Sequence, residues 1–362
     1  MQKLNKPPLT NSIAEQKGAG LIMFVLLLVL VGTGALLYFL GDSNIKKQRE
    51  IKTFSSLSDA KAALIGYAVL QPSKPGTLPC TDSLNNGSGV TSGTNACAKY
   101  IGRLPWKQLG MPMLKDSYGE CLWYALSPNF RNQMTTANRK LNPLNALTNG
   151  TINIVNDLDV PIVSDNPVIA LIMAPNFPVG GQIRSGMVTT YCTGDSIASK
   201  YLDIKGLINN ATGNVLGTSY TFKKGIPDNN FNDQIVYITA KDLFPILRKR
   251  IVKEILGDVD VKSGLVKYYQ SPAGASHNNY PCPSATVSGN ESCGLVTGFI
   301  PYNDPTVGLQ YTSLGTWLID NEWFAMTTYT YLNSTHIKVT VIDPLGSYTC
   351  DRNMNISSCA SP

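Results

Sequence analysis

One uninterrupted apolar stretch near the N-terminus constrains this chain more than any other feature. Residues 19–41 read AGLIMFVLLLVLVGTGALLYFLG and contain no formal charge. A run of about 20 apolar residues is long enough for one helix to cross a bilayer. We therefore predict a transmembrane helix over residues 19–41, preceded by a polar leader over residues 1–18 that contains Lys3, Lys6 and Lys17.

The position of Gly18 distinguishes this leader from a secretory signal. A secretory signal has a shorter apolar stretch, and its small-residue cleavage site follows that stretch. Here Gly18 precedes the stretch, so cleavage between Gly18 and Ala19 would leave the hydrophobic helix on the mature chain. An ordinary N-terminal membrane anchor is the alternative interpretation.

The cysteines indicate the compartment of the rest of the chain. All eight follow the apolar stretch, most of them in segments rich in Asn, Gly and Ser. An even number of cysteines in this setting predicts disulfide bonds and an oxidising compartment. The sequence has no Cys-x-x-Cys and only two His, so zinc-site spacings are absent. The predicted location is the inner membrane, crossed once, with the body in the periplasm, or the cell surface after assembly.

Length and charge limit the classes of function. The chain has 362 residues, enough for two modest domains after the helix, and 15% of them are charged. The formal net charge is +6, and its densest cluster is Lys46, Lys47, Arg49 and Lys52. We interpret this cluster as a solvated helix face rather than a nucleic-acid site.

The chain repeats a set of landmarks in one order. Each copy has a helical pattern, a Pro-Cys, a second Cys, a Gly-x-aliphatic-Pro-aromatic segment and an aromatic pair. The first copy places them at 59–70, 79–80, 97, 102–106 and 123–124, and the second at 243–269, 281–282, 293, 298–302 and 323–324. The loop from each Pro-Cys to the second Cys is hereafter the Pro-Cys excursion. A bridge from Cys80 to Cys97, or from Cys282 to Cys293, would close this loop and stabilise the fold by roughly 3 kcal/mol.

These copies predict an α+β fold in which the transmembrane helix is extended and followed by two tandem disulfide-stapled modules, residues 42–241 and 242–362. Each module combines a helix with an antiparallel sheet. The aromatic pairs and residues 168–174, 234–239 and 337–342 are predicted strands. Asp42, Asp59 and Asp242 are predicted helix caps, the last for a helix over residues 243–256.

A basic leader that ends in Gly and is followed at once by a long apolar helix resembles the class III signal of type IV pilins and type II secretion pseudopilins. The resemblance implies that prepilin peptidase cleaves between Gly18 and Ala19. It also implies that the helix is held in the inner membrane and then packs into a fibre with other pilins or pseudopilins. Most members begin the mature chain with Phe and carry Glu at its fifth position, where this chain has Ala19 and Met23. In lacking this Glu, the chain resembles K-type tip pseudopilins and some minor pilins.

Segments of the body resemble a poorly characterised group of prepilin-type, type II secretion-related proteins of Gram-negative bacteria. They are residues 102–106, 119–125, 172–175, 181–184 and 231–235, and the resemblance spans most of residues 17–255 and implies no catalytic residues. A bridge between Cys350 and Cys359 resembles the C-terminal loop staple of many pilins, and it leaves Cys121 with Cys192. Eight cysteines allow 105 pairings.

Few residues suggest chemistry. His277 and His336 are interpreted as loop or strand residues, because no nucleophile motif accompanies them. Asp157, Asp159 and Asp165 could supply oxygens to calcium, which K-type pseudopilins bind, but a polar turn is the simpler interpretation. We predict no other metal or cofactor and no catalytic residues.

Two functions remain from this sequence. The first is a non-enzymatic minor pilin or pseudopilin that assembles through its N-terminal helix and presents two modules, at the tip of the filament. The alternative is an anchored or tip adhesin that binds a surface or glycan through the second module. Tyrosines between residues 268 and 331 would form its face, although core and cross-strand packing in a sheet is the simpler interpretation of each of them. A tethered enzyme has the least support.

Overall fold

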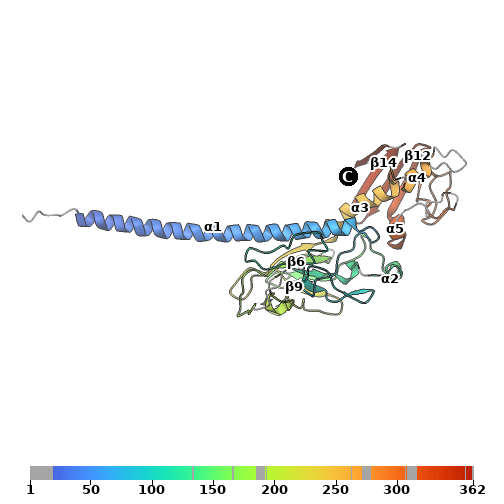
Figure 1. Ribbon diagram of the computed structural model, residues 1–362. Helices are drawn as coiled ribbons and strands as arrows, with labels where there is room; N and C mark the ends of the chain where they lie inside the picture. Colours follow the sequence, from blue (N-terminus) through green and yellow to red (C-terminus); the bar gives the residue numbers. More distant parts are fainter. Residues whose placement is uncertain are drawn as a thin grey trace, which may run out of the picture. The chain divides into compact units, whose positions relative to one another are not determined.

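The computed structural model describes residues 19–360 apart from residues 133, 165–166, 185–191, 193, 262, 271–278, 306, 308–315 and 355 (Figure 1). The side chains of residues 19–21, 34–43 and 136 also lie outside this description. The helices are α1 (Ala19–Leu70), η1 (Pro128–Phe130), α2 (Thr136–Leu141), η2 (Ala198–Lys200), α3 (Ala240–Leu256), α4 (Gly264–Tyr269), α5 (Thr316–Asp320) and η4 (Trp323–Met326).

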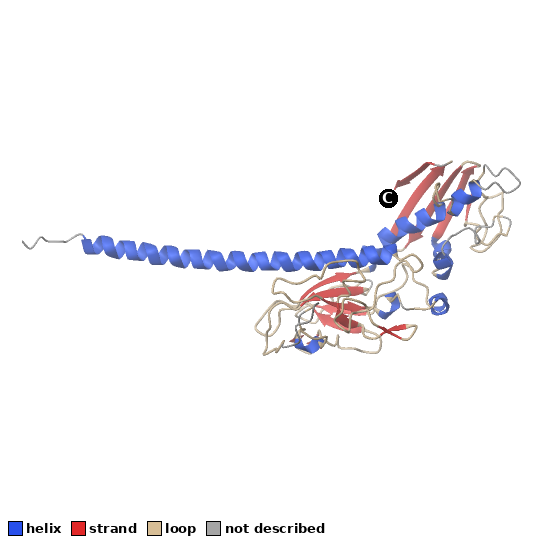
Figure 2. Ribbon diagram, in the orientation of Figure 1, coloured by secondary structure: helices blue, strands red, loops and turns tan. Residues whose placement is uncertain are grey.

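The strands alternate with long loops (Figure 2). They are β1 (Thr91–Ser92), β2 (Ala96–Cys97), β3 (Ile101–Arg103), β4 (Trp123–Leu126), β5 (Ile152–Val155), β6 (Ala170–Ala174), β7 (Ile204–Lys205), β8 (Ile208–Asn209), β9 (Tyr220–Lys223), β10 (Gln234–Ile238), β11 (Thr297–Gly298), β12 (Thr327–Asn333), β13 (His336–Asp343), β14 (Gly346–Asn353) and β15 (Ile356–Ala360).

The chain divides into two compact units, Met1–Ile51 and Lys52–Pro362. Helix α1 contributes to both units. The predicted boundary between residues 241 and 242 lies inside the second unit. Asp42 and Asp59 lie within α1, so the prediction that they cap helices is wrong.

The predicted transmembrane helix is corrected by the structure. Among the residues that the structure describes, no helix offers an apolar stretch of the length that a membrane crossing requires. The predicted fold class, led by a transmembrane helix, and the predicted single-pass location in the inner membrane are therefore wrong. The fold is mixed α and β, with several sheets and four disulfide bonds.

Two antiparallel sheets form the body of the second unit. The first sheet has the order β10-β6-β4-β3, and the second sheet has the order β11-β12-β13-β14-β15. Three two-stranded sheets complete the fold: β1-β2, β7-β8 and the parallel pair β5-β9. The predicted strands at residues 168–174, 234–239 and 337–342 are confirmed as β6, β10 and β13.

Each main sheet shares a buried core with one helix. Leu57, Ala60, Leu64 and Ala68 recur at intervals of three and four residues on α1, which places them on one helix face. They belong to the same buried cluster as Tyr124 of the first sheet. On the second sheet, α3 supplies the corresponding apolar face and packs on β13 and β14.

Helix α3 begins with a capping box rather than with an aspartate cap. Thr239 is the N-cap residue, and the Asp242 side chain accepts a hydrogen bond from the Thr239 backbone N–H at 2.8 Å. The predicted cap at Asp242 is therefore wrong by three positions, although Asp242 does take part in the cap. The predicted strand at Trp323 and Phe324 is also wrong, because these residues form η4 before β12 begins.

Candidate functional site

The longest continuous run of exposed apolar side chains among the described residues lies on the N-terminal part of α1. From Ile22 to Val31 every side chain is apolar, and each is between 51% and 72% exposed. The Thr33 hydroxyl donates to the Val29 carbonyl at 2.7 Å, so it is satisfied within the helix itself. A helix that is apolar on every face is stable only where apolar groups surround it. This segment, residues 22–31, is hereafter the apolar helix segment.

The predicted cleavage site lies at the start of this helix. Ala19 is the first residue of α1, whereas Gly18 and the rest of the leader lie outside the described residues.

Four disulfide bonds staple the second unit, which confirms the prediction of disulfide bonding. The pairs are the four that the sequence analysis named: Cys80–Cys97, Cys121–Cys192, Cys282–Cys293 and Cys350–Cys359. No free cysteine occurs among them. Disulfide bonds of this density are typical of proteins that fold in an oxidising compartment.

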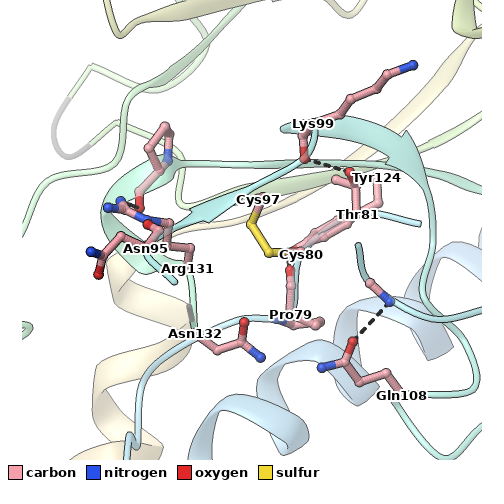
Figure 3. Close-up of a disulfide and its surroundings, with 12 residues drawn as sticks. Pro79, Cys80, Thr81, Asn95, Cys97, Lys99, Gln108, Tyr124, Arg131 and Asn132 are labelled. Carbon is pink, nitrogen blue, oxygen red and sulfur yellow. Dashed lines mark hydrogen bonds between the residues drawn. A yellow bond between two sulfur atoms is a disulfide. The ribbon is translucent and has the colours of Figure 1, made fainter. Parts of the chain in front are cut away.

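The two Pro-Cys excursions share a hydrogen-bond pattern, and Figure 3 shows the surroundings of the first, with the Cys80–Cys97 disulfide bond. Beside the first excursion, the buried Tyr124 hydroxyl donates to the Pro79 carbonyl at 3.3 Å. Beside the second, the buried Tyr329 hydroxyl donates to the Pro281 carbonyl at 2.8 Å. The structural counterpart of Tyr124 is therefore Tyr329, and not Phe324 as the sequence landmarks suggested.

The backbone around each excursion is paired in the same way. Asp82 and Arg103 exchange two backbone hydrogen bonds of 2.9 Å, and Ser284 and Phe299 exchange two of 2.8 Å. Each pair joins the second residue after the first Cys to the residue after the landmark Gly. A Cβ on Gly298 would lie 2.3 Å from the Ser284 carbonyl oxygen, which explains glycine at this position.

A buried polar network joins the loops of the first sheet. The Arg103 guanidinium lies 4.3 Å from the Trp123 ring centroid and 4.2 Å from that of Tyr201, and its Nη1 donates to the Cys121 carbonyl at 2.8 Å. Burial lowers the pKa of Arg103. Burial also raises the pKa of Glu120, which lies 3.7 Å from Arg184. None of these residues could be assigned to a network from sequence patterns.

Two buried carboxyl groups, Asp203 and Asp233, hold neighbouring loops together. Asp203 accepts from the backbone N–H of Asn232 at 2.7 Å, and Asp233 accepts from the backbone N–H of Asp203 at 2.8 Å. Burial raises the pKa of Asp203, and burial together with the charge of Asp203 raises the pKa of Asp233 well above its usual range. Because backbone N–H groups donate to one oxygen of each carboxyl group and tie the two loops together, we assign the pair a structural role.

The calcium candidates are engaged by lysines. Asp157 lies 2.7 Å from the Lys205 ammonium, and the hydrogen bond from Lys205 is the main cause that lowers the Asp157 pKa. Asp159 forms an ion pair with Lys223. Asp165 lies outside the described residues. The two candidates that the structure describes are therefore paired with lysines rather than available together as free oxygen ligands.

In another group of potential metal ligands, two of the ligand atoms are joined in a disulfide bond. Cys282, Cys293 and Glu291 lie within ligand distance of one another. The two sulfurs form a disulfide bond, so neither is a thiolate, and Glu291 accepts from the Cys282 backbone N–H at 3.1 Å. This cluster offers no metal site in the oxidised protein.

The histidines and tyrosines have local contacts. His336 is half-buried on β13, with its Nε2 3.7 Å from Asp351, and His277 lies outside the described residues. Tyr280 is buried and stacks on Tyr269, with ring centroids 4.8 Å apart. Tyr302 stacks on Phe324 at 4.3 Å. These contacts give the tyrosines named here packing roles.

Comparisons of the chain with protein-family models, with curated proteins and with solved structures found no match.

Proposed function

We propose that this chain is a non-enzymatic, minor pilin-like or pseudopilin-like subunit of a type IV pilus or type II secretion filament. It assembles through the apolar helix segment and presents the two disulfide-stapled sheets at the filament tip. Its partners are other pilins or pseudopilins and, before assembly, prepilin peptidase.

The observation behind this proposal is the exposed surface of residues 22–31. Ten consecutive apolar side chains surround this part of α1, and each is more than half exposed. At about 25 cal/mol per Å² of apolar surface removed from water, packing among similar helices would be strongly favourable. Equivalent helices of neighbouring subunits fit this surface, because each offers apolar side chains on every side.

Two further features support the proposal. The leader that ends at Gly18 and the order of landmarks resemble prepilin-type proteins. The four disulfide bonds suit a subunit that works in an oxidising compartment.

The proposal is tested by placing a charge in the apolar helix segment. Leu27→Arg buries a guanidinium among apolar helices, so we expect the amount of protein in sheared filaments to fall by about tenfold or more. The control is Leu158→Arg, because Leu158 is 81% exposed and lies in a turn far along the chain from α1. Equal incorporation of Leu27→Arg and the unsubstituted chain would overturn the proposal.

Processing gives an independent test. Cells with prepilin peptidase should yield an intact mass that corresponds to a chain starting at Ala19, and cells without it should yield the longer chain. A mass that does not depend on this peptidase would contradict the prepilin-type assignment.

A further inference from the structure

The two main sheets have corresponding strands, but in the described part of the chain the first sheet has four and the second has five. Cross-strand partners run through the first sheet as Gly102, Tyr124, Ile172 and Val236. They run through the second sheet as Gly298, Tyr329, Val339, Cys350 and Cys359. Strand β10 therefore corresponds to β14, and among the residues that the structure describes no strand of the first sheet corresponds to β15.

The free edge of β10 is open to pairing. Among the described residues, β10 pairs with β6 only. An edge strand presents alternate backbone N–H and C=O groups that have no strand partner, and such edges pair readily with another extended segment. The second sheet shows the geometry of that addition, since β15 pairs antiparallel to β14 along five residues.

A groove of about 760 Å³ runs beside β10. Phe54, Ser58 and Lys61 of α1 line it, and so do residues 162–164. Val236 and Tyr237 of β10 line it as well. The corresponding groove between α3 and β14 is smaller, about 480 Å³, and its lining includes Ser357 and Cys359 of β15.

The lysines that line the groove favour an acidic occupant. Lys61, Lys224 and Lys241 line it together with one carboxylate, Asp242. Asp242 is already paired with Lys61 at 2.8 Å. Lys224 and Lys241 are exposed, and the part of the chain that the structure describes places no carboxylate within ion-pair distance of them. Phe54 adds an apolar contact, being 62% exposed.

We infer that the groove binds an extended acidic segment of a partner protein as an antiparallel fifth strand on β10. The residue of that segment opposite Val236 corresponds to Cys359, which lies opposite Cys350 in the second sheet. Main-chain hydrogen bonds to β10 supply part of the affinity, and carboxylates on the segment reach Lys224 and Lys241. This inference goes beyond filament assembly and requires no filament.

A labelled peptide tests the inference on the full chain. The probe is a peptide of about eight residues in which Glu alternates with Val, the length of a common strand. We expect fluorescence anisotropy to report saturable binding in the micromolar range. Amide hydrogen exchange of residues 234–238 should slow when the peptide is bound. No saturable binding would overturn the inference.

Three controls separate strand addition from simple ionic attraction. K224E/K241E should weaken binding about tenfold or more, and a peptide with Lys in place of Glu should restore it. K249E/K253E reverses two lysines in the groove beside β14, whose edge is already paired with β15, so binding should be unchanged. A peptide N-methylated on alternate residues cannot form the ladder and should not bind. Equal loss with K249E/K253E, or equal binding of the N-methylated peptide, would overturn the inference.

Discussion

The two main sheets have the same order of central strands but are covered differently. Every residue of β4 and β6 is buried, because the first sheet is covered by α1 on one face and by the β5-β9 pair on the other. Strand β13 instead alternates between buried and half-buried or exposed residues, since α3 covers only one face of the second sheet. The comparison indicates that the repeated landmarks specify the centre of each sheet, whereas covering layers, edges and staples differ.

The disulfide bond that closes a long loop beside the first sheet gives the largest expected difference in stability between the two sheets. Cys121 and Cys192 are 71 residues apart, whereas Cys350 and Cys359 are nine apart. Because a longer loop has more entropy to lose, replacing both cysteines of a pair by Ala should lower the free energy of unfolding by about 4.5 kcal/mol for the long loop and about 2.5 kcal/mol for the short one. Urea unfolding under oxidising conditions measures both values. An equal loss of unfolding free energy for Cys350–Cys359 and Cys121–Cys192 would contradict the comparison.

The sequence predicted the centre of each sheet better than its register. Residues 168–174 are continuously apolar and form a strand buried on both faces, whereas residues 337–342 alternate and form a strand buried on one face. These patterns depend on local side chains, so they are readable from sequence. The aromatic pair at Trp323 and Phe324 was misassigned, because the partner of Gly298 is Tyr329, five residues later. Such a pairing is fixed by strand register across the sheet, which no local pattern records.

The candidate sites were less predictable than the strands. The apolar helix segment and the cysteines were visible as sequence patterns. Lys224, Lys241 and Val236 were not, because their proximity depends on how β10, the loop after β9 and α3 meet in the fold. The buried contacts of Arg103 with Trp123 and Tyr201 likewise join residues that are far apart in the sequence.

A buried ion pair should distinguish the second sheet from the first. Arg248 on α3 donates from Nη1 to both Asp343 oxygens at 2.6 and 2.7 Å, and both side chains are buried. Removing one partner leaves the other charge buried and unpaired, so Arg248→Met or Asp343→Leu should each cost about 3 kcal/mol. The double variant should recover most of that loss, as thermal or urea unfolding would show.

An exposed pair provides the matched control for this prediction. Lys338 lies 3.8 Å from Asp351, and their side chains are 42% and 38% exposed. Water screens such a pair, so Lys338→Met should change stability by less than about 0.5 kcal/mol. If Arg248→Met were equally mild, the ion pair would not anchor α3 to the second sheet.

The smallest expected effect concerns the tyrosine hydroxyl that donates a hydrogen bond to each Pro-Cys excursion. Tyr329 donates to Pro281 at 2.8 Å and Tyr124 donates to Pro79 at 3.3 Å, and both rings are fully buried. Replacement by Phe keeps the ring but leaves a buried carbonyl without its donor. We expect Tyr329→Phe to cost about 1 kcal/mol and Tyr124→Phe about 0.5 kcal/mol, because the longer bond is weaker.

The half-buried Tyr302 gives the reference for the loss of a hydroxyl alone, since the described residues show no hydrogen bond from its side chain. Tyr302→Phe should therefore leave the urea midpoint unchanged. If Tyr329→Phe behaved like this control, the shared hydroxyl would be a by-product of packing. A measurable loss at Tyr329 and Tyr124, but not at Tyr302, would show that both Pro-Cys excursions are held to their sheets by the same bond. Such a result would support the residue correspondence on which the missing fifth strand of the first sheet depends.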